Sequence, residues 1–247
     1  MKVGRPPKGK PLAAIVSLSA KRRMNDPRIP RCDVTAQGSS GIVLFMDFLA
    51  KTEYLEQVVA RHVGEAKGFA DLANLTFGWL AELFAFKPGH NYYAALALKS
   101  PAGKLEIKAS QGQFDTKALG LDSPKSLVSY AVRENRTVYL PQVTASDEKG
   151  EREFRYLEQT NEETTSIGQP SSETGVDIEP LIKAGLDKPC YLVAPLESNG
   201  EVLGALVLAV GAGRYFSSSP EDMVIASNFA SQIAFGLNLL QAKGSSA

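Results

Sequence analysis

The chain has 247 residues, 44% of them hydrophobic and 22% charged, which suits one large globular domain or two small ones. Its two cysteines, Cys32 and Cys190, do not suggest a disulfide framework. The apolar run Ile42–Ala50 is too short to span a bilayer and lies too deep in the chain for a signal peptide. We therefore expect a cytoplasmic protein that does not enter a membrane.

The net charge of zero hides an uneven distribution along the chain. Residues 1–31 contain nine Lys or Arg and one acid, so this segment carries +8 and the rest of the chain carries −8. Residues 1–40 also contain five prolines and show little hydrophobic periodicity. This composition predicts a flexible basic arm in front of an acidic body.

Two helices are predicted after the arm. From Gly41 to Val63, apolar residues recur at spacings of three and four, which is typical of an amphipathic helix. A second helix with the same spacing begins at Phe69 and ends before Lys87, where a Pro-Gly pair follows.

The hydrophobic period then changes from that of a helix to that of a strand. Tyr92–Leu98 and Lys104–Ser110 predict a β-hairpin with a turn between them. In the second strand, Leu105, Ile107 and Ala109 are expected to share one face, because side chains alternate along a strand.

The middle of the chain is predicted to combine one short helix, one short strand and a loop. Ser123 is expected to cap a helix that runs to Asn135, and a strand follows over 136–143. The acidic segment Asp147–Glu179 contains ten acids and three bases. Within it we expect helix over 151–159, a mobile loop over 160–176, and helical turns around 177–184.

The last part of the chain predicts two central strands and a long helix. Cys190–Glu197 and Glu201–Gly211 are apolar on both faces, and the Asn199-Gly200 pair between them is a strong hairpin signal. The final helix is expected to start at Pro220, with Ser219 as its cap. It carries two apolar stripes, one of large residues (Ile225, Phe229, Ile233, Leu237, Leu240) and one of small residues (Ala226, Ala230, Ala234).

Two stretches carry a resemblance to a known family. SLVSYAVRENRTVYLPQV (residues 126–143) and CYLVAPLESNGEVLGALVLAV (residues 190–210) resemble the corresponding parts of GAF domains, with Pro195, Leu196 and Gly204 at the usual landmarks. The resemblance covers about residues 64–243. It implies an α+β fold of GAF/PAS type: a six-stranded antiparallel sheet, terminal helices on one face, and a roof of loops and helices over a pocket on the other.

This resemblance gives a domain organisation and a candidate ligand site. We expect a basic arm over 1–40, an N-terminal helix over 41–63 for dimerisation or as a linker, the GAF-like domain over 64–243, and a tail over 244–247. The aromatic and basic side chains around the expected roof, together with one cysteine, are candidate ligand contacts: Tyr93, Tyr130, Tyr139, Arg155, Tyr156 and Cys190.

The ligand itself is not predicted. GAF domains commonly bind cyclic nucleotides, tetrapyrroles or small metabolites, but the Asn-Lys…Phe-Asp-Glu signature of cyclic-nucleotide binding is absent here. Residues 141–189 contain neither Cys nor His, so no covalent bilin is expected. The family also includes free methionine sulfoxide reductases, which need two or three cysteines at the pocket, whereas only Cys190 lies in this domain.

We therefore expect a protein that is not an enzyme and holds no metal. Cys190 in an apolar strand is more typical of a small core residue than of a nucleophile. His62 and His90 show no ligand-like spacing to each other or to the cysteines, so no metal site is predicted.

The basic arm has two interpretations. Val3–Lys8 resembles the Gly-Arg-Pro core of an AT-hook, which lies in the minor groove of A·T-rich DNA. In that interpretation, nucleic acid contacts come from Arg5, Lys8, Lys10, Lys21, Arg22 and Arg23. Alternatively, the arm is a solubilising tail, or it lies against the acidic segment of its own or a neighbouring subunit.

Three hypotheses on function remain open. The first is a sensory or regulatory module that binds a small molecule and signals through dimer or partner contacts. The second is a ligand-free structural or adaptor subunit, and the third is a nucleic-acid-associated regulator. We also expect a homodimer, because the final helix has more apolar perimeter than one sheet face needs and the apolar stripe of the N-terminal helix has no obvious strand to cover. The candidate interface residues are Phe45, Phe48, Leu55 and Val59.

Overall fold

The computed structural model describes residues 39–84, 86, 92–140, 154–158, 164–167, 175–184, 190–211 and 220–244. Seven strands form one antiparallel sheet in the order β2-β1-β7-β6-β3-β4-β5. Their bounds are β1 Tyr92–Lys99, β2 Leu105–Gln111, β3 Arg136–Leu140, β4 Phe154–Glu158, β5 Thr164–Ile167, β6 Cys190–Ser198 and β7 Glu201–Val210. The α+β sheet architecture expected from the sequence is confirmed, with one strand more than the resemblance implied.

The central hairpin of the sheet follows the prediction closely. Strands β6 and β7 are buried on both faces, and a two-residue turn joins them. Asn199 and Gly200 have φ values of 57° and 80°. These left-handed angles define the type I′ turn that an Asn-Gly pair favours, and its twist matches that of the flanking strands.

The acidic segment corrects the prediction. A helix was expected over 151–159 and a mobile loop over 160–176, but the backbone forms β4 and β5 there. Strand β4 pairs with β3, for example Val138 with Tyr156, and β5 then pairs with β4. Backbone pairing with the rest of the sheet outweighs the helical tendency of this segment. A helix here would have no apolar stripe to pack against the fold.

Strand β2 contains a second departure from the prediction. Its pairing with β1 shifts between Leu96 and Ala97, so that Lys108 is an extra residue on β2. Leu105 and Ile107 therefore face the same side as the roof, whereas Ala109 packs with the helices on the other side. A β-bulge reverses the alternation of side chains in this way.

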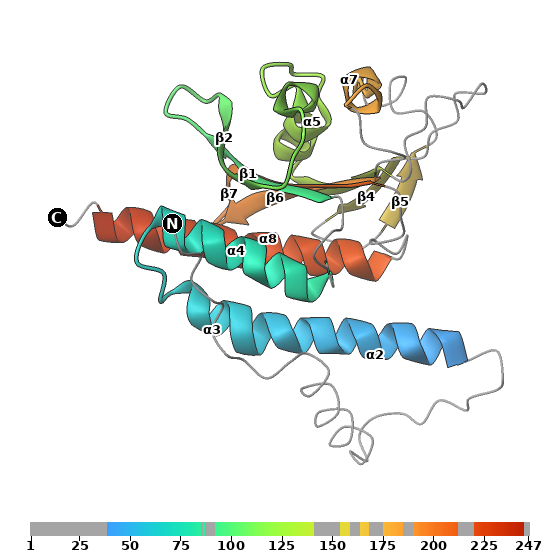
Figure 1. The fold of residues 1–247 in the computed structure, drawn as a ribbon, viewed down its shortest axis with the longest axis vertical. Helices are drawn as coiled ribbons and strands as arrows, with labels where there is room; N and C mark the ends of the chain where they lie inside the picture. The colour runs from blue at the N-terminus through green and yellow to red at the C-terminus, as the bar shows by residue number, and fades with distance from the viewer. Residues whose placement is uncertain are drawn as a thin grey trace, which may run out of the picture.

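Two long helices cover one face of the sheet. They are α4 (Phe69–Leu83) and α8 (Pro220–Gly244), which lie beneath the sheet in Figure 1. Both predicted stripes of α8 are used inside the chain: Ile225, Phe229 and Ile233, like Ala226, Ala230 and Ala234, are fully buried. By length and composition alone α8 would also qualify as a membrane-spanning helix, but over half of its most apolar stretch is buried, as in the core helix of a globular domain.

The N-terminal helix forms a further layer under α4 and α8 (Figure 1). It consists of α2 (Ser39–Tyr54), a single π-helical turn η2 (Leu55–Val59) and α3 (Ala60–Val63). Leu55, Val59 and Val63 are four residues apart and all buried. In a regular α-helix with 3.6 residues per turn, side chains spaced by four residues move gradually around the helix axis. The π-turn holds more residues per turn, so these three side chains stay directed at the same core.

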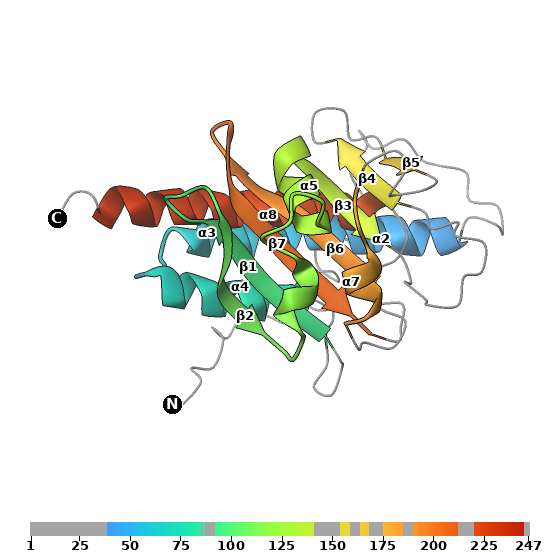
Figure 2. The ribbon, with the colours of Figure 1, turned by 90° about the horizontal axis from the view of Figure 1, so that it is seen from above.

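Short elements cover the other face of the sheet and form the roof. They are the 3-10 turn η3 (Thr116–Leu119), α5 (Leu127–Glu134) and α7 (Glu179–Ile182), above the sheet in Figure 1 and in front of it in Figure 2. The cap of α5 is Ser126, whose Oγ accepts a hydrogen bond from the Ser129 N–H at 3.1 Å, and not Ser123 as predicted. Ser123 instead accepts from the Lys125 N–H in the preceding turn.

Candidate functional site

The roof face of the sheet carries two tyrosines side by side at one end of the central strands. Tyr93 of β1 and Tyr191 of β6 both pair with Ala209 of β7, which lies between them. All three side chains belong to the core on the roof side. The small side chain of Ala209 leaves space between the two phenol rings, and a third ring covers it.

Phe114 is that third ring. It stacks on Tyr93 with ring centroids 5.1 Å apart, and meets Tyr191 edge-on at 6.1 Å. The loop that carries Phe114 passes so close to β1 that a Cβ on Gly112 would lie 2.1 Å from the Tyr92 carbonyl oxygen. Glycine at position 112, with φ of 91°, therefore allows Phe114 to reach the tyrosines.

The hydroxyl groups of the two tyrosines differ. Tyr191 donates a 2.9 Å hydrogen bond to the carbonyl oxygen of Leu181 in α7, which ties the roof to the sheet. The Tyr93 hydroxyl is buried and has no hydrogen-bond partner in the part of the chain that the structure describes. Burial raises the pKa of Tyr93, and the nearby Ser110 hydroxyl opposes this rise without reaching hydrogen-bond geometry. At neutral pH the Tyr93 hydroxyl is thus protonated, and among the described residues it has no hydrogen-bond acceptor in good geometry.

Over the middle of the sheet, the roof is filled by its own side chains. Leu127, Val128 and Ala131 of α5 pack against Val193 and Val207, and all five are buried. The segment before α7 joins this packing through a hydrogen bond from the Asp177 N–H to the Lys125 carbonyl oxygen, 2.8 Å long. Among the described residues, a cavity of about 30 Å³ is found there, lined by residues of η3, α5 and α7 and by Gly120, Ser123, Ser126 and Asp177 of the segments next to them. It has room for a water molecule or two.

Comparisons with known proteins address the fold. No protein-family model matches the sequence, and no curated protein matches it. Among solved structures, the phycoerythrobilin-bound GAF domain from a cyanobacterial phytochrome is similar, with a TM-score of 0.54 and 15% identity over 78% of this chain and 97% of that chain. The phycocyanobilin-bound GAF domain from a cyanobacterial phytochrome has a TM-score of 0.52 and 15% identity over 78% and 96%.

The chain has a GAF fold. At this level of identity the likeness concerns the fold, and the site of this chain has to be argued from its own residues. The sheet between a helical layer and a roof is the architecture that the sequence resemblance implied.

The fold brings together only some of the predicted ligand residues. Tyr93 lies on the roof side, and so does Tyr130 of α5, whose ring carries the Arg133 guanidinium at 5.5 Å. Tyr139 and Cys190 pack in the other core, against the helices. Placing these two in the pocket was wrong, because both strands are apolar on each face and their pattern does not tell which face carries the roof.

The two remaining ligand candidates lie on β4. The backbone register pairs Arg155 with Tyr139, and Tyr156 with Val138, but the side chains of β4 are outside the described residues. Conversely, the sequence analysis missed Phe114 and Tyr191. Tyr191 directly follows Cys190 on the same strand, and neighbouring side chains of a strand point to opposite faces, so one of the two had to face the roof. Phe114 lies in a loop that no sequence pattern marks.

The predicted dimer residues occupy a different environment from the one expected. Leu55 and Val59 are buried in the same core as α8 and α4, and Phe48 packs against it in part. The premise that this stripe has no partner within one chain was therefore wrong. The side chain of Phe45 is outside the described residues. Dimerisation itself stays a prediction.

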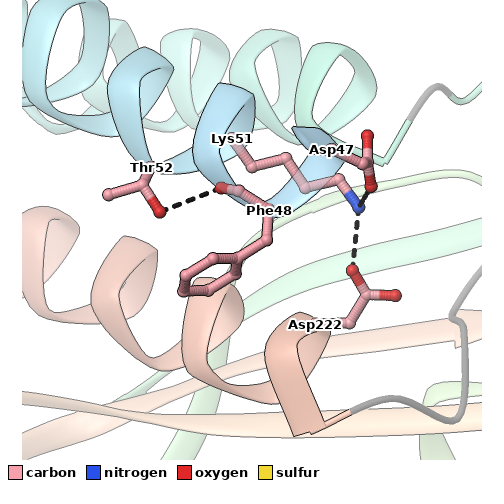
Figure 3. A network of polar contacts seen from close by, with 5 residues as sticks. All are labelled: Asp47, Phe48, Lys51, Thr52 and Asp222. Carbon is pink, nitrogen blue, oxygen red and sulfur yellow. Dashed lines mark hydrogen bonds and ion pairs between the residues drawn. The ribbon is translucent and has the colours of Figure 1, made fainter. Parts of the chain in front are cut away.

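A polar network fixes the N-terminal helix to α8 (Figure 3). The Lys51 ammonium lies 2.8 Å from an oxygen of Asp222 at the start of α8 and 2.9 Å from Asp47. Lys51 and Asp222 are 12% and 7% exposed, and the ammonium also lies 5.7 Å from the centre of the Phe84 ring. Burial lowers the pKa of Lys51, but the two carboxylates outweigh burial and the net pKa is raised.

The basic arm was the other predicted site. All of its candidate nucleic acid contacts (Arg5, Lys8, Lys10, Lys21, Arg22 and Arg23) lie outside the described residues. The nucleic acid hypothesis therefore stays a prediction from the sequence.

Proposed function

We propose that this protein is a non-enzymatic sensory or regulatory module that binds a small molecule at the Tyr93 end of its roof face. The observation that carries the proposal is the Tyr93 hydroxyl, which is buried and has no partner within the described residues. Leaving a buried hydroxyl unsatisfied costs about 1–3 kcal/mol. A ligand with a polar group at this point would recover that free energy.

The surroundings of Tyr93 favour a small and largely apolar ligand. The rings of Phe114 and Tyr191 form an apolar wall, and Phe114 is half-buried on a loop that leads out to exposed residues. A flat ring or a short apolar chain with one hydrogen-bonding group matches this wall. The described roof residues do not leave space for a group as large as the bilins named in the two similar structures, and residues 141–189 contain no cysteine for covalent attachment.

The same geometry argues for binding without covalent chemistry. Cys190 is the cysteine of the domain, and it is buried on the helical side of the sheet, away from Tyr93. A thiol in that position is separated from a roof-side ligand by the sheet itself. We therefore expect the module to report binding through a change of structure and to pass it on through contacts with a partner.

A thermal-shift screen of a metabolite library against the full chain tests the proposal. We expect at least one compound to raise the melting temperature of the wild type, because a ligand that binds only the folded state stabilises it. The shift should be lost in Tyr93→Phe and kept in Tyr139→Phe, a matched change on the opposite face. Tyr93→Phe should itself melt no lower than the wild type. An equal shift in both variants would contradict the assignment of the site.

A second candidate function is favoured by the packing of the roof. The cavity of about 30 Å³ is what a ligand-free structural or adaptor subunit would show. In that case, no compound in the screen would shift the wild type, and the protein would act through its surfaces alone. A gel shift with nucleic acid at low salt tests the nucleic acid hypothesis. If the full chain binds and the chain without residues 1–38 does not, the contact lies in the arm.

A further inference from the structure

The two edges of the sheet are built differently. The strand order places β2 at one edge and β5 at the other, so no described strand pairs with the outer side of either one. The outward N–H and C=O groups of an edge strand are free to pair with a further strand. Charged residues, proline or a bulge on the edge strand discourage such pairing.

Strand β2 carries two of these protections. Glu106 and Lys108 are exposed and form an ion pair along the strand. Lys108 is also the extra residue of the β-bulge, which interrupts the regular pairing with β1. A further strand at this edge would meet two charged side chains and an irregular backbone, so we do not expect β2 to accept one.

Strand β5 carries none of these protections. Its four residues, Thr164–Ile167, include no charged residue and no proline. Its register with β4 is continuous, from Ile167 opposite Phe154 to Thr164 opposite Leu157, and contains no bulge. Threonine and isoleucine, which make up three of the four residues, are β-branched and favour strands. The outer edge of β5 is therefore a regular, uncharged template for strand addition.

A segment of this chain that lies outside the described residues suits that template. Residues 12–18 read LAAIVSL, an apolar run interrupted only by Ser17. A short continuous apolar run is consistent with a strand that is covered on both faces. Pro11 precedes it, and proline is tolerated at the start of a strand. No other apolar run in residues 1–38 reaches four residues, so this segment is the one in the arm with a strand-like sequence.

Charge favours the same contact. Residues 1–31 carry +8, whereas the segment Asp147–Glu179, which contains β4 and β5, has ten acids and three bases. Opposite charges attract the arm to this edge of the sheet. Lys21–Arg23 follow the apolar segment in the sequence, and Glu162 and Glu163 precede β5. An antiparallel orientation of the segment brings its basic end to the start of β5.

The connecting chain is long enough for this contact. Twenty residues separate Leu18 from Ser39, the first residue of α2. Extended, they span about 70 Å, whereas a domain of this size has a radius of gyration of about 16 Å. Figures 1 and 2 both place the start of α2 and β5 at the same end of the molecule. The tether also gives the arm a high effective concentration at its own domain, which favours the same chain over a second copy.

We propose that residues 12–18 of the arm add to the outer edge of β5 in the same chain, as an antiparallel eighth strand. Main-chain pairing provides the contact, and the opposite charges around it provide the preference for this edge. The docked arm places Lys21–Arg23 beside the acidic segment, so nucleic acid would compete with that segment for the same side chains. This contact goes beyond the proposed ligand site, because it involves neither Tyr93 nor the roof elements.

Hydrogen exchange of the full chain tests the contact. We expect the outward amides of β5 to be protected in the wild type, and to exchange about 10-fold faster or more in the chain that lacks residues 2–18. The amides of β2, at the opposite edge, should exchange equally in both forms and serve as the control. Unchanged exchange of β5 on deletion would overturn the proposal.

Disulfide cross-linking identifies the occupant of the edge. In a Cys32→Ser background, Ser166→Cys is combined with one of three arm substitutions: Ala14→Cys, Ile15→Cys or Val16→Cys. We expect a disulfide within a single chain for at least one of them. Opposite residues of neighbouring antiparallel strands have Cα atoms about 4.5–5.5 Å apart, which a disulfide can bridge. The same three substitutions combined with Glu106→Cys in β2 are the matched control and should stay reduced.

Gel mobility without reductant distinguishes the other occupants. A covalent dimer between the arm and β5 would mean that the arm of a second copy covers the edge. A covalent dimer of Ser166→Cys without an arm cysteine would mean that β5 pairs with β5 of a second copy. Either dimer would overturn the assignment to the same chain. Equal cross-linking to β2 and β5 would mean that the arm has no defined place on the sheet, and would overturn the proposal entirely.

Discussion

The two faces of the central sheet are closed by very different parts. On one face, α4 and α8 supply helices of 15 and 25 residues, and the N-terminal helix packs against them from below. On the other face, the roof elements η3, α5 and α7 have only 4, 8 and 4 residues. One face is therefore a continuous helical core, whereas the other is assembled from short pieces.

This difference suggests how stability and response are divided in the molecule. A long helix loses its packing only as a unit, so the helical face resists local opening. A short element held by a few contacts, such as α7 with its bond from Tyr191 to Leu181, can move at a smaller cost in free energy. The unsatisfied Tyr93 hydroxyl lies on this adjustable side. We expect the helical face to provide most of the stability and the roof face to provide the response.

The largest effect should come from a change that damages both faces together. A Cβ on Gly204 of β7 would lie 2.0 Å from the Ala97 carbonyl oxygen and 2.8 Å from the Leu98 Cα. Gly204→Ala must push β1 away from β7 in the middle of the sheet, and we expect a loss above about 4 kcal/mol in urea denaturation, or failure to fold.

Gly78→Ala in α4 is the matched control for that substitution. No atom lies within 4 Å of its added Cβ, so the helix should gain about 0.5–1 kcal/mol from the lower entropy of the unfolded chain. A normal denaturation midpoint for Gly204→Ala would mean that β1 and β7 do not approach each other as described.

A pair of equivalent truncations compares the two faces directly. Leu192 on the helical side and Leu140 on the roof side are both fully buried, on adjacent strands. Truncation to Ala costs about 2–5 kcal/mol in a core, and the cost falls where the surroundings collapse into the cavity. We expect Leu192→Ala near the upper end and Leu140→Ala near the lower end. Equal losses in urea denaturation would contradict the division into a rigid and an adjustable face.

A smaller effect is expected at the junction of the N-terminal helix. Lys51→Met leaves Asp222 buried without its cation, but Asp222 keeps its favourable position in the first turn of α8. We expect a loss of about 1–2 kcal/mol at pH 7. Part of it should return in Lys51→Met/Asp222→Asn, which removes the charge of Asp222 as well. If the loss of unfolding free energy in the double variant equals the sum of the losses in the two single variants, Lys51 and Asp222 do not interact energetically.

The pH dependence of this junction follows from the raised pKa of Lys51. A group whose pKa is higher in the folded state contributes its full stability below the ordinary pKa of 10.5 and loses it as the pH rises through the raised value. The difference in unfolding free energy between wild type and Lys51→Met should therefore be constant near neutral pH and shrink only above pH 10.5. A difference that shrinks below pH 9 would exclude Lys51 as its source.

Much of the fold could be predicted because local signals and tertiary structure agree. The Asn199-Gly200 turn, the Pro220 start of α8 and the close approach at Gly204 each depend on a backbone requirement that residue type reveals directly. Strands β4 and β5 were missed because the acidic composition of their segment dominated the interpretation. The alternation of Phe154, Tyr156 and their neighbours was a weaker signal that only pairing with β3 makes decisive.

The candidate site was less predictable than the fold, because it depends on which face of the sheet each strand presents. A strand that is apolar on both sides gives no indication of face, so Tyr139 and Cys190 were placed with Tyr93 although they lie across the sheet from it. The N-terminal stripe shows the same limit. Its periodicity indicated correctly that Leu55 and Val59 are buried, but not that α8 of the same chain buries them.

The strand order has a consequence for how the protein is made. The centre of the sheet joins β1 to β7, so Tyr92 pairs with Val210 across more than a hundred residues of chain. During synthesis, β1 has no inner neighbour until the ribosome has released β7, and α8 comes later still. Contacts of such long sequence separation form slowly and leave apolar strands exposed in the meantime. The nascent chain should therefore depend on chaperones until β7 and α8 have emerged.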